Sequence, residues 1–340
     1  MTFDLNTRRQ VGKTSLQLPT FGFGAAHLGG MFGRVPGEVA HATLDAAWES
    51  GIRFYDTAPW YGRGLSELRV GGFLIDKPRD EFIITTKVGR SLRRPANPKN
   101  FDRAPWGGGL NMEVMWDYSY DGIMRAYEQS LQRLGLDTVD ALLVHDPEQS
   151  TEPGGPSLDD LADSGIKALE ELKSSGQIKA YGMGLNATES LDTYARRVPL
   201  DFLIVAMPYT LLDQSALASG LKYCVDNDMS VIIGAPYASG ILVTGPGPNA
   251  RYRYAAAPAD IQEKAGKIQE ICRSHGVSLA AAALKFPLAH PAVVAIIPGG
   301  AKPEEVTSNI GHFAETVPAG LWSDLRAAGL IDPEAPVPAD

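Results

Sequence analysis

Four residues whose side chains can together move a proton stand near the ends of apolar segments in the first half of the chain. Asp56 and Tyr61 lie in "FYDTAPWYG", Lys87 lies in "ITTKV" and His145 lies in "LLVHD". A Tyr phenol has an ordinary pKa of about 10, and we expect the ammonium of Lys87 to lower it by stabilising the phenolate. A His can donate a hydrogen bond to a carbonyl oxygen. These residue types predict a site that moves a proton on or off an alcohol or carbonyl oxygen while another group moves a hydride.

Each of these residues also has a purely structural interpretation. An Asp at a strand end is commonly a turn residue, a Tyr beside Trp commonly packs, a Lys at a strand end usually reaches solvent, and a His after an apolar strand is often a hydrogen-bonded core residue. Three titratable groups at the ends of three consecutive apolar strands favour the functional interpretation over four separate structural ones.

Eight short apolar segments are predicted to be the β-strands that position these residues. They begin at Thr20, Ile52, Phe82, Asp140, Ile178, Asp201, Ser230 and Ala292. Helical patterns lie between them, such as "GEVAHATLDAAWESG", "SYDGIMRAYEQSLQRLG", "SLDDLADSGIKALEELKSSG" and "ADIQEKAGKIQEICRSHG". Apolar strands that alternate with helices imply a parallel sheet covered by helices. Eight such units predict an α/β fold, a closed (β/α)₈ TIM barrel, with the four residues converging at the carboxyl ends of the strands.

A doubly wound nucleotide-binding fold is the competing layout. The stretch "GFGAAHLGG" from Gly22 resembles the start of its phosphate-binding fingerprint. That fingerprint needs a third glycine three residues after Gly24, where this chain has His27. We therefore favour the barrel.

Two segments are longer than ordinary loops, 89–117 and 245–258, and both follow predicted strands. Long loops on a compact scaffold are usually functional lids or disordered excursions, and we favour lids at the carboxyl-terminal face. The start, "RRQVGKTSLQLP", predicts a small β-hairpin, and "IDPEAPVPAD" predicts a loose tail. We expect residues 1–340 to form a single barrel domain, with its core at about 18–315 and a C-terminal helix and tail at 316–340.

The composition excludes several classes of partner. The chain has 31 basic and 40 acidic residues, a formal net charge of −9, which argues against nucleic acid. Cys224 and Cys272 have no paired spacing that suggests zinc, so we expect buried, reduced thiols and no metal. No apolar run reaches the roughly 18 residues that span a bilayer, and "MTFDLNTRRQ" lacks a secretory signal. These patterns predict a cytoplasmic enzyme or binding protein without a membrane partner, and they leave the oligomeric state open.

The four segments "FYDTAPWYG", "ITTKVG", "LLVHD" and "IIPGGAKPEEVTSNI" resemble the aldo-keto reductases, (β/α)₈ barrel oxidoreductases that bind a nicotinamide dinucleotide. The resemblance covers nearly the whole chain. It implies that Tyr61 is the general acid or base, that Lys87 and Asp56 tune it, and that His145 orients the substrate oxygen.

The segment after the eighth strand differs from the pattern of members of that family that prefer NADP. Those members carry Lys and Ser after the strand's Pro and an Arg further on, where this chain has Gly299, Gly300 and Glu305. A carboxylate there repels a 2′-phosphate and can accept a hydrogen bond from a ribose hydroxyl, so we predict NAD. The alternative is that Glu305 only suits the start of a helix. By the same resemblance Asn309 contacts the adenine.

Two other cofactor positions depart from the family. A Ser-Asn pair often holds the nicotinamide amide after strand five, but "GMGLNAT" leaves Asn186 alone for that role. An aromatic residue often stacks on the nicotinamide after strand seven, where this chain has Gly234, with Tyr237 and Tyr209 as candidate replacements. The turn "APYASGIL" resembles the family's pyrophosphate contact and assigns cofactor contacts to Pro236, Tyr237, Ser239, Gly240 and Leu242.

The stretches "WDYSYDGIMRAYEQSLQRLGLDTVDALLVHDPE" and "GAPYASGIL" resemble a bacterial branch of the family. That branch oxidises cyclic hemiacetals of aldoses or pyridoxal to lactones, a direction that suits NAD. Four aromatic residues are expected to wall the substrate pocket, with at least one of them packing in the core: Trp60, Trp106, Trp116 and Tyr118. One alternative is an NADPH-dependent aldehyde or ketone reductase. A second is a non-enzymatic cofactor-binding regulatory subunit, which the intact set of four polar residues argues against.

Overall fold

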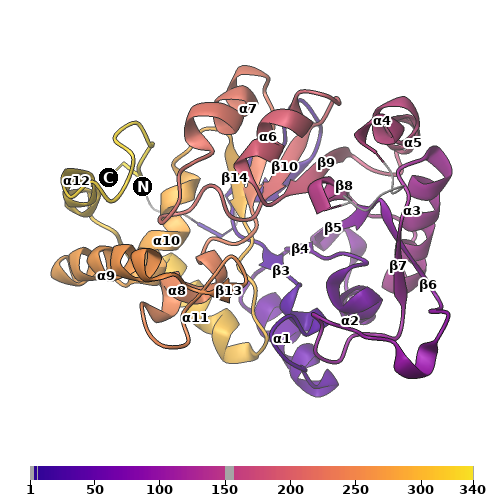
Figure 1. Cartoon of the computed structure of the whole chain (residues 1–340), viewed down its shortest axis with the longest axis horizontal. Coiled ribbons are helices and arrows are strands. Elements are labelled where there is room, and N and C mark those ends of the chain that lie inside the picture. Colours follow the sequence, from indigo (N-terminus) through magenta and orange to yellow (C-terminus); the bar gives the residue numbers. More distant parts are fainter. Residues whose placement is uncertain (1–3, 6, 150–156, 340) are drawn as a thin grey trace.

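The structure, a computed structural model, describes residues 4–5, 7–149 and 157–339, and its centre is an eight-stranded parallel sheet (Figure 1). The sheet has the order β14-β11-β10-β9-β8-β5-β4-β3. Its strands are β3 (Phe23–Gly24), β4 (Phe54–Asp56), β5 (Ile83–Val88), β8 (Ala141–His145), β9 (Ala180–Leu185), β10 (Phe202–Val205), β11 (Ser230–Ile233) and β14 (Val293–Ile296). Each of the eight predicted strands is therefore present, and each pairs with its neighbour in sequence order.

The sheet closes on itself between β3 and β14. Phe21 pairs with Ile296 in a parallel bridge, and Gly24 pairs with Gly299. The Ile296 N–H donates to Thr20 O at 2.9 Å. A Cβ on Gly24 would lie only 2.7 Å from the backbone oxygen of Ile297, so the closing strands approach closely because position 24 is glycine. The predicted (β/α)₈ barrel is confirmed.

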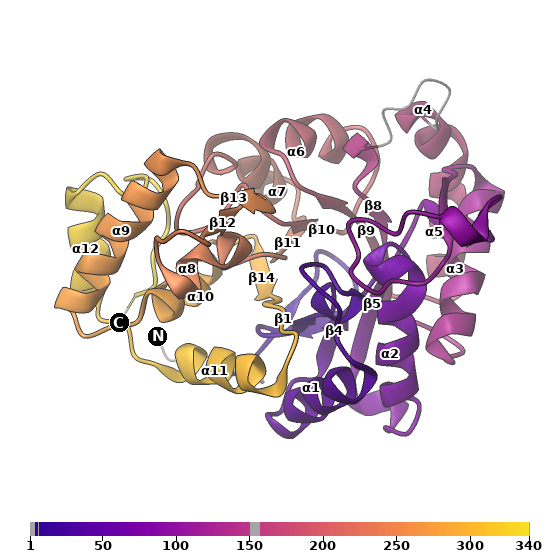
Figure 2. The same ribbon diagram turned by 60° about the horizontal axis from the view of Figure 1, so that its bottom comes forward.

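Helices cover the outside of this barrel, as Figures 1 and 2 show from two directions. They are α1 (Gly37–Glu49), α2 (Leu65–Leu74), α3 (Tyr120–Leu134), α4 (Leu158–Asp160), α5 (Ile166–Ser174), α6 (Thr188–Ala195), α7 (Lys222–Asp226), α8 (Ile241–Thr244), α9 (Ala259–Ser274), α10 (Leu279–Leu288), α11 (Pro303–Ala314) and α12 (Ala319–Ala327). The four quoted helical patterns correspond to α1, α3, α4 with α5, and α9. α3 ends at Gly135, whose φ of 66° is a conformation that favours glycine.

The predicted N-terminal hairpin is also present. β1 (Arg8–Gln10) pairs antiparallel with β2 (Gln17–Pro19). Val11, Leu16 and Leu18 of this hairpin are buried in one cluster with Phe54 of the barrel. The hairpin therefore supplies apolar side chains to the core.

The two long loops contain regular structure. The first holds an antiparallel ribbon of β6 (Arg90–Arg93) and β7 (Glu113–Trp116), and the second holds a hairpin of β12 (Arg251–Tyr252) and β13 (Ala255–Ala256). The prediction of a loose tail is wrong, because Ile331 and Ala335 are buried. Pattern reading missed this packing because the segment is too short and Pro-rich to show a period. Among the described residues, no helix is long and apolar enough to cross a bilayer.

Candidate active site

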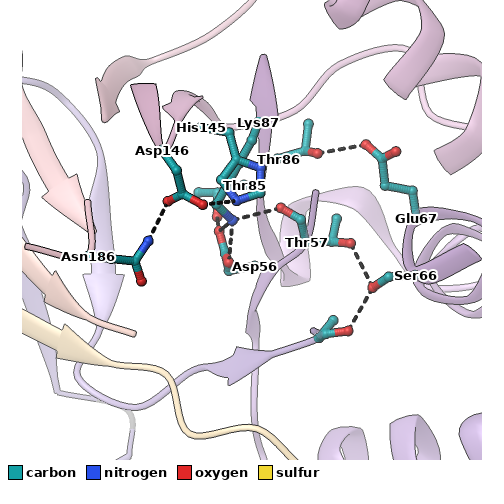
Figure 3. A network of polar contacts seen from close by, with 11 residues as sticks. Asp56, Thr57, Ser66, Glu67, Thr85, Thr86, Lys87, His145, Asp146 and Asn186 are labelled. Atoms are coloured by element: carbon teal, nitrogen blue, oxygen red, sulfur yellow. Dashed lines mark hydrogen bonds and ion pairs between the residues drawn. The ribbon is translucent and has the colours of Figure 1, made fainter. Parts of the chain in front are cut away.

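The carboxyl ends of β4, β5 and β8 bring Asp56, Lys87 and His145 into one cluster (Figure 3). Lys87 Nζ lies 2.7 Å from Asp56 Oδ2, 2.9 Å from Asp56 Oδ1 and 3.0 Å from Thr57 O. Thr85 Oγ1 donates to Asp56 Oδ1 at 2.8 Å. The side chains of the ion pair are only 2 % and 3 % exposed. All three donors of the ammonium are thus satisfied inside the barrel mouth.

Tyr61 joins this cluster from a 3₁₀ turn (Tyr61–Gly64) that follows β4. Lys87 Nζ lies 4.7 Å from the centre of the Tyr61 ring. The rings of Tyr61 and His145 are 5.5 Å apart and nearly perpendicular. The structure therefore brings together all four residues that the sequence singled out.

The electrostatics at Tyr61 differ from the expectation. Burial raises the pKa of Tyr61 well above its ordinary value, and the carboxylates of Asp56 and Asp146 act in the same direction, while Arg90 opposes them. Because Asp56 holds both of its oxygens against Lys87, the ammonium is largely compensated. The phenol is the favoured form in this structure, not the phenolate.

His145 is neutral at ordinary pH. Burial lowers its pKa well below the usual value, and the positive charges of Arg90 and Lys87 lower it further. Nε2 lies 3.4 Å from Asp146 Oδ2, which is beyond the usual length of a hydrogen bond. The N–H of a neutral ring at this position is therefore available to another acceptor.

A second buried charge pair, which sequence analysis missed, adjoins this cluster. Arg90 Nη2 donates to Asp146 Oδ2 at 3.2 Å and to Gln149 Oε1 at 3.3 Å. Burial, with the nearby charge of Asp146, raises the pKa of Glu148 to about 7. The available signals were an Arg directly after the third strand in "TKVGR" and two acids after the His in "VHDPE".

Three of the four predicted pocket aromatics surround the cluster. Trp106 contacts Trp60, with ring centres 5.5 Å apart, and Tyr61, with ring centres 5.9 Å apart. The Arg90 guanidinium lies 4.0 Å from the centre of the Trp116 ring. Tyr118 is only 1 % exposed and belongs to the core, in line with the expectation that at least one of the four packs there.

Two of the segments predicted to hold the cofactor, after β11 and after β14, come together, whereas Asn186 lies beside the cluster and is bonded to Asp146. Tyr237 Oη donates to Asn309 Oδ1 at 2.9 Å, and Asn309 Nδ2 donates to Gly299 O at 3.2 Å. These bonds join the turn after β11, the loop after β14 and helix α11. Tyr209 is fully buried against Phe286, so its ring cannot stack in place of the missing aromatic at 234. Tyr237 is only partly buried, and its bond to Asn309 holds the hydroxyl, so its ring stays the candidate for that place.

The loop that contains Gly299 and Gly300 leads into α11. Glu305 Oε2 accepts a hydrogen bond from the Ala301 N–H at 2.8 Å. A Cβ on Gly299 would lie 2.4 Å from His27 Nδ1, so His27 of the first loop contacts this segment. Glu305 thus has the local bond expected of a helix-start residue and also presents a carboxylate beside the loop.

The turn after β11 has an unusual backbone. Ser239 has a φ of 63° and Gly240 a φ of 104°, whereas Pro236 and Leu242 are buried and support the turn. Ser239 Oγ accepts a hydrogen bond from the Tyr254 N–H at 3.0 Å. The β12–β13 hairpin is thereby attached to a predicted cofactor contact.

That hairpin lies next to the turn after β11 (Figure 2), and its side chains contact two loops of the barrel mouth. Asp213 Oδ2, after β10, accepts from Tyr252 Oη at 3.2 Å and from Arg253 Nη2 at 3.1 Å. On the other side, the Arg251 guanidinium lies 5.0 Å from the centre of the Phe32 ring, after β3. The hairpin therefore spans the rim above the turn at Ser239.

The fold and this cluster define the class of protein. Residues 20–329 match the Aldo/keto reductase family, and the chain belongs to that family. It is accordingly an oxidoreductase that acts on aldehyde or alcohol groups of small molecules with a nicotinamide cofactor. Among the described residues, no group of three His, Cys, Asp or Glu side chains is arranged to hold a metal ion.

Two curated relatives and one solved structure are similar over nearly the full length. A D-threo-aldose 1-dehydrogenase of a Pseudomonas species is 38 % identical, with 96 % of this chain and 98 % of the relative covered. A pyridoxal 4-dehydrogenase of Microbacterium luteolum is 37 % identical, with 97 % and 100 % covered. The holo form of aldo-keto reductase AKR11C1 from Bacillus halodurans matches with a TM-score of 0.73 and 26 % identity, covering 98 % of each chain.

Proposed function

We propose that the protein is an NAD-dependent dehydrogenase that oxidises the hemiacetal carbon of a small polar substrate, an aldose or pyridoxal, to a lactone. The observation that carries this proposal is the buried Lys87–Asp56 ion pair, which lies against the Tyr61 ring with neutral His145 beside it. A phenol, an ammonium and an imidazole around one point suit a reaction that moves a proton at an oxygen.

Tyr61 is the proposed proton carrier. In oxidation it accepts the proton of the anomeric hydroxyl, and in reduction it returns a proton to the carbonyl oxygen. Burial raises its pKa, which makes the phenolate a strong base once formed and makes oxidation faster at alkaline pH. The Lys87 ammonium faces the Tyr61 ring, and Asp56 holds it in place while compensating most of its charge.

His145 is proposed to orient the reacting oxygen. A neutral imidazole can donate one N–H to that oxygen without competing with Tyr61 for the proton. The long separation between Nε2 and Asp146 Oδ2 leaves this donor available. Trp60, Trp106 and Trp116, which lie around the cluster, are the proposed wall against the apolar face of a sugar or a pyridine ring.

The residues after β11 and β14 fit a dinucleotide. Gly299 gives the loop after β14 a backbone without a side chain, Ser239 carries a hydroxyl on the turn after β11, and Asn309 carries an amide on α11. The cofactor supplies the hydride acceptor when bound. Glu305 is proposed to favour NAD, since its carboxylate repels a 2′-phosphate at that loop.

The relatives support the substrate class. Two dehydrogenases at 37 to 38 % identity and almost complete coverage are named for an aldose and for pyridoxal. Both substrates form small polar hemiacetals, and a rim with buried charges beside Trp rings suits such molecules.

Initial rates with NAD⁺ and with NADP⁺ test the proposal, using L-fucose, L-galactose, D-arabinose and pyridoxal as substrates near neutral and mildly alkaline pH. We expect NAD⁺-linked oxidation of at least one of them. Activity with NADP⁺ alone would instead assign the protein to the NADPH-dependent reductases.

The variant Tyr61→Phe then tests the mechanism. We expect turnover to fall by a factor of about 10² to 10⁴ while NAD⁺ affinity changes less than about twofold. Tyr120→Phe is the matched control, because it removes an exposed phenol oxygen from α3. Normal turnover by Tyr61→Phe would rule out this mechanism.

A further inference from the structure

Asp146 is a buried carboxylate in an unusual backbone conformation. It directly follows β8, and its φ of 42° is rare for a residue other than glycine. Its N–H donates to Gly184 O of the neighbouring strand at 3.0 Å. Such a conformation persists where surrounding contacts over-determine it, and it is concentrated at functional sites.

Asp146 binds the side chain of Asn186. Asn186 Nδ2 donates to Asp146 Oδ1 at 2.9 Å, and the Asn186 N–H donates to Glu148 Oε1 at 2.8 Å. Burial raises the pKa of Asp146, whereas the charges of Arg90 and Lys87 act in the opposite direction and favour its carboxylate. A carboxylate only accepts hydrogen bonds, so the amide turns its NH₂ group toward Asp146. Figure 3 shows the amide oxygen pointing away from Asp146. One orientation of the amide is thereby selected.

Arg90 provides the counter-charge. Its Nη2 donates to Asp146 Oδ2, the oxygen that Asn186 leaves free, and its side chain is 2 % exposed. A guanidinium is always a donor, so Asp146 can use both oxygens as acceptors at once. Each carboxylate oxygen of Asp146 therefore has its own donor, Asn186 for Oδ1 and Arg90 for Oδ2.

We propose that Asp146 is the positioning residue that orients the Asn186 amide so that its oxygen accepts a hydrogen bond from the carboxamide of a bound nicotinamide. The inference rests on the proposed function in two respects, that the chain binds a nicotinamide dinucleotide and that Asn186 contacts its carboxamide. The residue before Asn186 is Leu185, which offers no hydroxyl to share this task. Asp146 acts through Asn186, not on the reacting atoms.

The test compares two ligands that differ only in the nicotinamide. Dissociation constants for NAD⁺ and for ADP-ribose are measured by titration calorimetry with wild type, Asp146→Ala, Asn186→Ala and the double variant. We expect Asp146→Ala to weaken NAD⁺ binding about tenfold and to leave ADP-ribose binding unchanged. Because both residues act on one contact, the double variant should bind NAD⁺ no more weakly than Asn186→Ala.

Asp140→Ala is the matched control. Asp140 is a buried acid at the other end of the same strand, where it pairs with Arg79 and Lys179. It should lower stability without changing the ratio of the two dissociation constants. Asp146→Asn keeps an acceptor oxygen for Asn186 and should restore most of the NAD⁺ affinity.

Three results would overturn the proposal: an equal loss for both ligands, no loss for either, or additive losses in the double variant. If Asp146→Ala does not fold, Asp146→Leu, which also removes both acceptor oxygens, is compared with Asp146→Asn on the same ligand pair, and equal NAD⁺ binding by the two would overturn the proposal. If wild type does not bind NAD⁺, the proposed cofactor is wrong, and NADP⁺ with 2′-phospho-ADP-ribose then tests Asp146 separately.

Discussion

The ammonium of Lys87 lies between both carboxylate oxygens of Asp56, at 2.7 and 2.9 Å, and faces the Tyr61 ring at 4.7 Å. The pair is almost completely buried, so each charge depends on the other for compensation. Removing one partner of a buried pair commonly costs about 3 to 5 kcal/mol, whereas replacing both by apolar groups costs less. Stability and chemistry should therefore respond differently to single and double substitution.

We expect Lys87→Met to lose about 3 kcal/mol of unfolding free energy, because Asp56 is left as an uncompensated buried charge. Turnover should fall by a factor of about 10² or more. Adding Asp56→Leu should restore part of the stability and none of the activity. Urea denaturation and initial rates measure the two effects. Recovery of turnover in the double variant would show that the charges are needed only for folding.

Glu148 predicts a specific dependence of stability on pH. Its folded pKa of about 7 lies above the ordinary value of 4.5, so the folded state binds more protons between these pH values. The protonated Glu148 carboxyl stabilises the folded wild type fully below pH 4.5, and this stabilisation is lost as the pH rises through about 7. The free energy of unfolding of Glu148→Gln, relative to that of wild type, should therefore rise by about 1 to 2 kcal/mol when the pH is raised from 5 to 8. Urea denaturation at both pH values measures the gain.

The exposed Glu128→Gln in α3 is the control for that experiment, and it should show the same difference from wild type at pH 5 and pH 8. Asp146 and Arg90 face Glu148 in all of these proteins, so the comparison changes only the charge at position 148. A constant difference for Glu148→Gln would mean that its carboxyl titrates as an ordinary exposed group.

We expect the charge of Glu305 to determine the preference for NAD⁺ over NADP⁺. Glu305→Gln keeps an oxygen to accept from the Ala301 N–H and removes the negative charge. We expect kcat/KM with NADP⁺ to rise about tenfold while kcat/KM with NAD⁺ changes little. Glu304→Gln, which changes an exposed acid in the same first turn of α11, should leave the ratio unchanged. If the ratio of kcat/KM with NADP⁺ to kcat/KM with NAD⁺ is the same in both variants, the charge of Glu305 does not determine the cofactor preference.

We expect the β12–β13 hairpin to slow the release of the cofactor. Asp213→Ala removes the acceptor of both Tyr252 Oη and Arg253 Nη2, so the hairpin loses its attachment on one side. We expect NADH to dissociate about tenfold faster in stopped-flow fluorescence, with a smaller effect on its association rate. Asp228→Ala, which breaks an exposed pair with Lys13, is the control. An unchanged dissociation rate would show that the hairpin does not cover the bound cofactor.

Much of the barrel was predictable because apolar strands and amphipathic helices have different periods. Parallel strands also end at one face, so Asp56, Lys87 and His145 could be placed together from the positions where their strands stop. Tyr61 could be placed in the same cluster because it lies only a short distance along the chain from Asp56. These inferences use sequence order alone, and the structure agrees with each placement.

Contacts between loops could not be predicted in the same way. Arg90 looked like one more charge in a long Arg-rich segment, and only the turn at Gly89 and the β6–β7 ribbon bring it to Asp146. The bond between Tyr237 and Asn309 likewise has no signal in the sequence. A loop path depends on many weak contacts that have no period, and the pKa of a side chain depends on that path.

The closure of the barrel has a consequence for synthesis of the chain. β3 pairs with the segment around β14, and Arg9 donates to the backbone oxygen of Val293, 284 residues away. While the ribosome is still making the second half of the protein, β3 and the N-terminal hairpin lack these partners and expose an open sheet edge. Such edges invite association with other chains, so the last strand to emerge is also the one that removes this hazard.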